Sequence, residues 1–256
     1  MARGAKRRHS GSAIDLGMIQ MSRKCWANAL GGCDTLSGEH VVSQSVLRQA
    51  GGAIGTEGMM RVPDGRKSVS ALKSNILCRK HNAELSPLDA EAGRLMAFLR
   101  SANSPTFEGA LDVDGATLER WALKTTVNSV AAGWSDEARW MADLLVVKTI
   151  FGAEPVPPGC GLYLVETARR HDGRPLEFSF GPLWTDPPES KQLAGATIGM
   201  NGLSFFVATI PHIVDRFAAL AKPGDAYASH RYVHHPQGIT IHREGASSLP
   251  IRLRWA

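Results

Sequence analysis

The stretch SNILCRKHNAELSPLD, from Ser74 to Asp89, contains three structural signals in direct succession. It begins with SNILC, a short strand-like run. It continues into CRKH, in which Cys78 and His81 have the close spacing of a zinc knuckle. It ends in SPLD, where Ser86 as the cap, Pro87 at the first helical position and an acidic residue three positions after the cap predict the start of a helix.

A second pair of cysteines lies upstream of this stretch. Cys25 and Cys33 flank WANALGG, and three thiolates with one imidazole suffice for a tetrahedral zinc site. The gap in the first pair is wider than usual, so two alternatives stay open: one of these cysteines is not a ligand, or the residues are buried cysteines and a surface histidine. A loop-rich segment with little core of its own is the kind of structure that a metal stabilises. We therefore predict a structural Zn²⁺ held by Cys25, Cys33, Cys78 and His81.

Between the two half-sites lies LSGEHVVSQSVLR, from Leu36 to Arg48, in which Glu39 and His40 precede a run that we expect to be strand-like, HVVSQSVL. The pair is either the polar edge of an ordinary strand or a metal ligand beside a general base. The loop that follows, RQAGGAIGTEGMMRVPDGRKS, contains glycines and Pro63, which exclude a long helix.

In this order, CWANALGGC, SGEHVVSQSVL and LKSNILCRKHNAELS resemble the HNH, or ββα-metal, endonuclease family. The resemblance implies that His40 is the general base that deprotonates the attacking water. It also implies that Glu39 and Asn82 hold a catalytic divalent cation, Mg²⁺ or Mn²⁺, and that Asn75 braces the loop bearing the histidine. If His81 bound this catalytic cation instead, the zinc assignment would fail while the nuclease interpretation survived.

The chemistry of phosphodiester cleavage agrees with these roles. A neutral imidazole near pH 7 suits the activation of water, with an expected contribution of roughly 10² to 10⁴ in rate. A hard cation with oxygen ligands suits the charge that builds on the phosphate, and magnesium accepts a carboxylate and an amide carbonyl while keeping several waters.

Basic residues are concentrated in the first third of a chain whose formal net charge is +5. A basic patch beside a candidate site favours a polyanionic substrate, although a solvated surface with a basic tail gives the same pattern. The predicted nucleic-acid contacts are Arg48, Arg61, Arg66, Lys67, Lys73, Arg79 and Lys80.

We expect an α+β protein with four parts. Residues 1–22 form a basic N-terminal arm and residues 23–86 the zinc-stapled ββα-metal module. Residues 87–153 are a helical segment, with helices over SPLDAEAGRLMAFLR, GATLERWALKTTVNSVAAG and DEARWMADLLVVKTIFG. Residues 154–256 form an antiparallel β-rich part of unknown role, with about five to seven strands and a short helix at HIVDRFAAL.

Several residues outside the module have competing interpretations. Two or three of His230, His234, His235 and His242 could meet across a hairpin as a metal site, although solvent-facing strand residues are the simpler explanation. Cys160 is expected to be a buried thiol. Arg120, Trp121 and Lys124 either line a groove for nucleic acid or belong to a solvated helix face. Trp121, Trp134 and Trp140 are interpreted as core anchors.

At 256 residues and 43% hydrophobic, the chain can bury a normal core. It has neither an apolar run of the roughly 18 to 20 residues that a membrane helix needs nor a signal peptide, so we expect a cytoplasmic protein. The first hypothesis is a metal-dependent endonuclease that cuts DNA or, alternatively, RNA, and the resemblance suggests a bacterial restriction or phage-defence context. Residues 87–256 would then mediate homodimerisation or bind a partner protein. The second is a catalytically inactive zinc-containing module that binds nucleic acid or protein.

Overall fold

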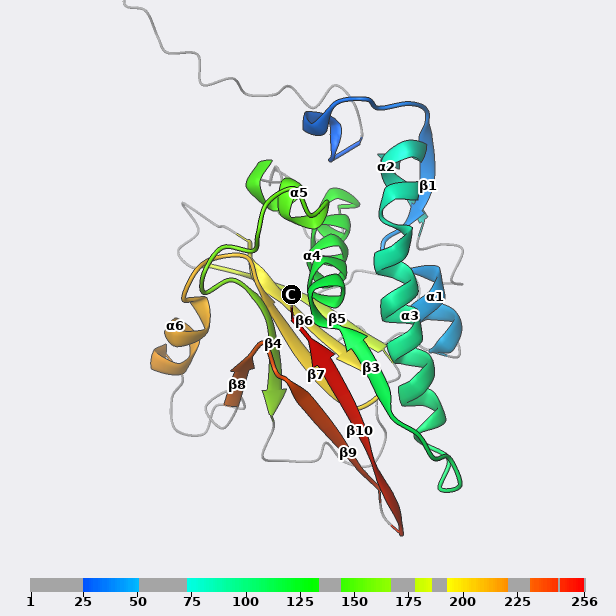
Figure 1. Cartoon of the computed structure of the whole chain (residues 1–256). Coiled ribbons are helices and arrows are strands. Elements are labelled where there is room, and N and C mark those ends of the chain that lie inside the picture. The colour runs from blue at the N-terminus through cyan, green and yellow to red at the C-terminus, as the bar shows by residue number, and fades with distance from the viewer. Residues whose placement is uncertain are drawn as a thin grey trace, which may run out of the picture.

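The fold is that of a computed structural model, which describes residues 25–50, 73–133, 144–166, 178–185, 193–220, 231–243 and 245–255. Helices and antiparallel sheets are combined, so the predicted α+β class is confirmed. The basic arm, the loop at 51–72 and His230 lie outside the described residues. In Figure 1 the N-terminal strands and helices lie at one end of the molecule, and α3 and α4 connect them to the sheets.

The N-terminal part begins with a 3-10 turn, η1 (Asn28–Leu30), and contains a two-stranded sheet. Strand β1 (Leu36–His40) pairs antiparallel with β2 (Lys73–Cys78), so that Glu39 lies opposite Ser74. Helix α2 (Arg79–Glu84) follows β2 directly. The strand predicted over SNILC is therefore confirmed.

The strand-like run predicted over HVVSQSVL is wrong beyond its first residue. β1 ends at His40, and Gln44–Gln49 form helix α1. Val42 and Val46, which are four residues apart, are both buried in the core, so the apolar spacing is that of a helix and the preceding turn.

The helix predicted at Ser86 is confirmed as α3 (Ser86–Ser101), but its predicted cap is wrong. Leu85 alone separates α3 from α2, and no side chain caps the helix; Ser86 instead donates its hydroxyl to the carbonyl oxygen of Asn82 at 3.4 Å. Near the middle of α3, Gly93 lets α1 approach closely, because a Cβ atom at this position would lie 2.6 Å from the Cβ of Ser45.

Two further helices follow. α4 (Gly115–Ala131) is capped by Asp114, whose side chain accepts the backbone N–H of Thr117 at 2.9 Å, as helix N-caps commonly do. Nearly all of α4 is buried, including Trp121, as predicted. The third predicted helix is described only as α5 (Leu144–Ile150), and Trp134 and Trp140 lie outside the described residues.

The C-terminal part contains a five-stranded antiparallel sheet in the order β5-β6-β7-β4-β8. The short helix predicted at HIVDRFAAL is present as α6 (Ile213–Leu220). The strands of this sheet are β4 (Gly161–Glu166), β5 (Phe178–Trp184), β6 (Leu193–Met200), β7 (Leu203–Ala208) and β8 (Arg231–His234).

A second sheet joins the helical segment to the C-terminus. β10 (Ala246–Arg254) pairs antiparallel with β9 (Gly238–Arg243) and parallel with β3 (Leu111–Asp114). Strand β3, which lies between α3 and α4, was not predicted from the sequence. Its four residues are too short for a recognisable alternating pattern, and the strand exists because β10, distant in sequence, provides its partner.

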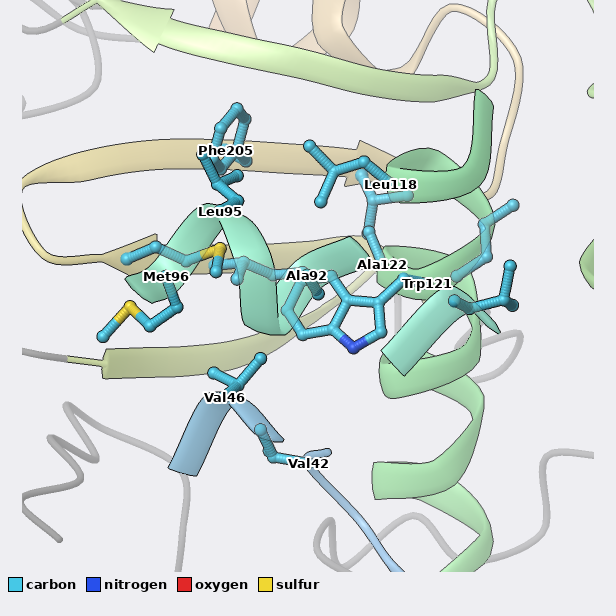
Figure 2. Close-up of a cluster of buried hydrophobic side chains, with 14 of the residues drawn as sticks. Val42, Val46, Ala92, Leu95, Met96, Leu118, Trp121, Ala122 and Phe205 are labelled. Atoms are coloured by element: carbon cyan, nitrogen blue, oxygen red, sulfur yellow. The ribbon is translucent and has the colours of Figure 1, made fainter. Parts of the chain in front are cut away.

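One hydrophobic cluster includes side chains from the N-terminal part, the helices and both sheets. Figure 2 shows its centre, where Val42 and Val46 face Trp121 of α4 and Met96 of α3, and Phe205 of β7 lies on the other side of the helices. The N-terminal part therefore shares its core with the rest of the protein. None of the described helices is both long and apolar enough to cross a membrane.

Candidate metal centre and catalytic site

The structure brings Cys25, Cys33, Cys78 and His81 together. The Nδ1 atom of His81 lies 3.4, 3.6 and 3.3 Å from the Sγ atoms of Cys25, Cys33 and Cys78, respectively. With zinc bond lengths of about 2.3 Å to sulfur and 2.0 to 2.1 Å to nitrogen, a tetrahedral site places these atoms about 3.6 Å apart. The donor set and its spacing therefore fit a structural zinc ion, and the wide gap between Cys25 and Cys33 does not exclude either residue.

The protonation states of a thiol and of the imidazole in this cluster depend on burial. Burial and the neighbouring Cys25 thiol raise the pKa of Cys33 to about 12 when no metal is bound. Burial lowers the pKa of His81, which favours the neutral imidazole that a metal requires. A bound cation would reverse the first effect, because it stabilises thiolates directly.

Local backbone contacts position the quartet. The backbone N–H of Arg79 donates to the carbonyl oxygen of Thr35 at 2.8 Å, and that of Lys80 donates to the carboxylate of Asp34 at 3.1 Å. These contacts tie the turn after Cys33 to the first turn of α2, which carries His81. Phe151, beyond the end of α5, packs edge-on against the His81 ring at 5.4 Å between centroids.

Glu39 is buried, with 4% of its surface exposed, and its carboxylate forms an ion pair with a lysine. Oε1 of Glu39 lies 2.8 Å from Nζ of Lys124, on α4. The same ammonium lies 2.8 Å from both carboxylate oxygens of Asp89, on α3. Burial raises the pKa of the Glu39 carboxyl above its ordinary value, and the positive charge of Lys124 opposes that shift.

Lys124 is itself 1% exposed, so this network is a buried one. Its two carboxylates and one ammonium sum to one negative charge. Ser43 extends the network, because its hydroxyl donates to Asp89 and accepts the indole N–H of Trp121 at 2.7 Å. Trp121 and Lys124 therefore do not line a groove or a solvated helix face, as the sequence analysis had considered.

His40, the last residue of β1, is half-buried beside this network. Burial lowers the pKa of its imidazole, and the positive charges of Lys73 and Arg48 lower it further. Its Nε2 atom is buried and has no hydrogen-bond partner within the described residues. The side chain thus favours the neutral form, and the hydrogen-bonding capacity of this nitrogen is unused by the part of the chain that the structure describes.

The two asparagines lie in different surroundings. Asn82, on α2, neighbours Glu39, since its side chain lies close enough to lower the pKa of that carboxyl. It also donates Nδ2 to the hydroxyl of Ser37 at 3.3 Å. Asn75 is exposed on β2, and within the described residues its side chain makes no hydrogen bond. Glu39 and Asn82 are therefore adjacent, whereas Asn75 does not join them.

Helix α4, which lies far from β1 in the sequence, contacts the end of that strand. Asn128 accepts the indole N–H of Trp26 at 2.9 Å and donates Nδ2 to the carbonyl oxygen of Val41 at 3.4 Å. Together with Lys124, these contacts hold the turn after His40 against the helical segment. The position of His40 thus depends on residues well outside the stretch that resembles the nuclease family.

The predicted nucleic-acid contacts are accessible wherever the structure describes them. Arg61, Arg66 and Lys67 fall in the loop at 51–72, outside the described residues. The others are exposed on α1, β2 and α2, the elements around Glu39 and His40: Arg48, Lys73, Arg79 and Lys80.

The network role of Asp89 and Lys124 was not predicted from the sequence. Asp89 was interpreted as part of a helix cap and Lys124 as a residue of a groove or solvated face. A signal was present for the lysine, because it follows Trp121 by three residues and precedes Asn128 by four, and therefore lies on the buried face of α4. No protein family, curated protein or solved structure was found to match the chain.

Proposed function

We propose that the protein is a metal-dependent endonuclease of the HNH type that hydrolyses phosphodiester bonds. The observation that carries the proposal is the position of Asn82. It directly follows the zinc-ligating turn at His81 and lies beside Glu39, which is next to His40 on the paired strand. A metal-stabilised turn thereby positions an amide, a carboxylate and an imidazole from two separate half-sites.

In this proposal His40 takes the proton from the attacking water. Its lowered pKa keeps the imidazole neutral at pH 7, and a neutral imidazole is the form that accepts a proton. The unpaired buried Nε2 is the atom that we assign to this step. Asn75, which is exposed on β2, would support the neighbouring loop rather than the reacting groups.

Glu39 and Asn82 would hold the divalent cation, since a carboxylate and an amide carbonyl are hard oxygen donors of the type that Mg²⁺ or Mn²⁺ takes. When bound, the cation would supply positive charge at the scissile phosphate and help the leaving oxygen. Lys124 orients Glu39 by binding Oε1. The positive charge of Lys124 also offsets part of the negative charge of Glu39, so less of that charge is available to attract the cation.

The proposed substrate is DNA, or alternatively RNA. Arg48, Lys73, Arg79 and Lys80 are exposed around the candidate site and can neutralise backbone phosphates on either side of the bond to be cut. A restriction or phage-defence role would suit such an activity. The C-terminal sheets would then select the target or bind a partner.

The buried ion pair favours a second candidate function. Glu39 is neutralised by Lys124 and is nearly inaccessible, as expected if the network only holds α4 against the N-terminal part. The protein would then be a zinc-containing module that binds nucleic acid or a partner protein through its basic surface without cutting.

Relaxation of supercoiled plasmid separates the two functions. The full-length protein is incubated with plasmid in Mg²⁺ or Mn²⁺, alongside EDTA and the variants His40→Ala and His242→Ala. His242 is an exposed histidine on β9 and serves as the matched control. Metal-dependent nicking by wild type and His242→Ala, but not by His40→Ala, supports the endonuclease. Plasmid retardation in a gel without nicking under any condition supports the binding module.

A further inference from the structure

A second group of metal-ligating side chains lies between α4 and the end of β8. Glu119 of α4 is 3% exposed, although it carries a carboxylate. Its Oε1 accepts the backbone N–H of Leu162 at 2.7 Å and lies 2.8 Å from Nε2 of His235. Within the described residues the histidine is its only ion-pair partner. A buried carboxylate without a fixed cation is costly, so this position calls for a bound or titratable positive charge.

The backbone is shaped to admit this carboxylate. Gly161, the first residue of β4, has φ +101°, and a Cβ atom there would lie 2.1 Å from Oε1 of Glu119. Only glycine leaves that space open in this conformation. The chain thus accommodates the charged group at the point where β4 begins.

His235 is held in a conformation that non-glycine residues rarely adopt. Its φ is +45°, and its ring stacks between those of Trp255 and His234, at 4.1 and 3.9 Å between centroids. Strained residues of this kind persist only where the surrounding structure determines them, and they are enriched at functional sites.

His234 is oriented in the way that metal-ligating histidines commonly are. Its Nε2 lies 2.9 Å from the backbone carbonyl oxygen of Cys160 and therefore carries the proton of that hydrogen bond. This leaves Nδ1 with a free lone pair. A carbonyl that accepts the second N–H of a ligand histidine fixes its tautomer and ring orientation.

We propose that Glu119, His234 and His235 form a second metal site, which binds a divalent transition-metal ion such as Zn²⁺. One ligand atom from each residue lies within 4.8 Å of the others. Two histidines and a glutamate leave a fourth position for water or an anionic ligand, as in catalytic rather than structural zinc sites. The side chain of His234 is exposed, which gives the ion access from solvent.

The geometry also sets the expected affinity. Ligand atoms around a tetrahedral ion lie about 3.3 Å apart at bond lengths of 2.0 to 2.1 Å. The 2.8 Å contact between Oε1 of Glu119 and Nε2 of His235 must therefore lengthen before both atoms bind one ion. The planes of the two imidazoles are 22° apart, and one ring must turn before both direct a lone pair at one ion. We therefore expect weaker binding here than at the quartet of three cysteines and His81, which needs no such adjustment.

Titration of the full-length metal-free protein with Co²⁺ tests the proposal, because the two sites differ in spectrum. The cysteine site gives an intense thiolate-to-cobalt band in the near ultraviolet. The second site would give only weak visible absorption, since it contains no sulfur. An excess of Mg²⁺ is kept present to occupy the cation site proposed at Glu39 and Asn82. Under this condition we expect two Co²⁺ binding steps, the tighter with the thiolate band and the weaker without it.

Variants assign the weaker step. His234→Ala and His235→Gln should each weaken it at least ~10-fold and leave the thiolate band unchanged. His242→Ala, which removes an imidazole outside the group, should leave both steps unchanged. A single binding step in wild type, or a second step that persists in both His234→Ala and His235→Gln, would overturn the proposal. Neither result bears on the proposed nuclease, which uses different residues.

Discussion

The ammonium of Lys124 lies 2.8 Å from Oε1 of Glu39, and both side chains are almost completely buried. The two residues belong to α4 and β1 and are 85 positions apart in the sequence. Their contact, shared with Asp89, determines where the carboxylate beside His40 points. The nuclease-like stretch is thus positioned by a charge from the helical segment.

Removal of the Lys124 charge should be strongly destabilising. Lys124→Met keeps most of the side-chain volume but leaves the buried carboxylate of Glu39 and the half-buried carboxylate of Asp89 without a cation. Breaking one side of a buried ion pair costs about 3 to 5 kcal/mol, and denaturant unfolding measures it. Lys148→Met is the matched control, since Lys148 and Glu154 form an exposed pair whose loss costs less than about 1 kcal/mol.

A double variant checks the cause of that loss. Adding Glu39→Gln to Lys124→Met removes one of the uncompensated charges. The double variant should therefore lose less free energy of unfolding than the sum of the losses in the two single variants. Additive effects would show that Lys124 contributes through packing rather than through its charge.

Zinc binding should depend on the four clustered residues and not on Cys160, the cysteine outside the cluster. Cys78→Ser is expected to lose the tightly bound metal and to lower the melting temperature, because metal binding and folding of this segment are coupled. Cys160→Ser should keep the metal, since Cys160 is buried outside the quartet. Elemental analysis measures the metal content of the two purified variants, and thermal unfolding measures their melting temperatures. Equal metal content in the two variants would contradict the assignment.

Two glycines with positive φ should respond differently to alanine. Gly161→Ala places a methyl group against the buried Glu119 carboxylate and should destabilise the protein by about 2 to 4 kcal/mol, from backbone strain and overpacking together. Gly245 has φ +69° but open space around it, so Gly245→Ala should cost only about 1 to 2 kcal/mol. Equal losses would mean that the space at Gly161 is not needed by the carboxylate.

The pH dependence of cleavage should reflect the surroundings of His40. Burial is the main cause of its lowered pKa; Lys73, Arg48 and Lys124 add to the shift, and Asp89 opposes it. The imidazole therefore stays neutral as the pH falls through 6.5, its ordinary pKa, and protonation stops catalysis only at lower pH. Initial rates from pH 5 to 8 should be level above pH 6.5. A rate that already declines above pH 7 as the pH is lowered would contradict this assignment.

Local patterns predicted much of the structure. The helices at Ser86 and Gly115, the strand over SNILC and the pairing of Cys78 with His81 follow from spacing within short stretches. The clustering of Cys25 and Cys33 with them was predicted from the need of a loop-rich segment for a metal. The remainder depends on partners distant in the sequence. β3 forms because β10 lies beside it, and the run after His40 turns into α1 because its valines face α3 and α4.

The charges around the site show the same distinction. Glu39 and His40 could be selected from their motif, but the motif does not reveal that a lysine on α4 neutralises the glutamate. An ion pair between distant segments leaves no periodic signal in either. The contact of Glu119 with His235 was likewise unforeseen, although the sequence had indicated that histidines of this region could meet as a metal site.

The most direct measurement of the central claim is single-turnover cleavage of an end-labelled DNA duplex by metal-loaded wild type and His40→Ala. Unfolding curves and zinc content first establish that both proteins are folded. We predict that His40→Ala is slower by about 100-fold or more, because it lacks the base that takes the proton from water. Equal rates in the two proteins, or no cleavage by wild type, would contradict the account.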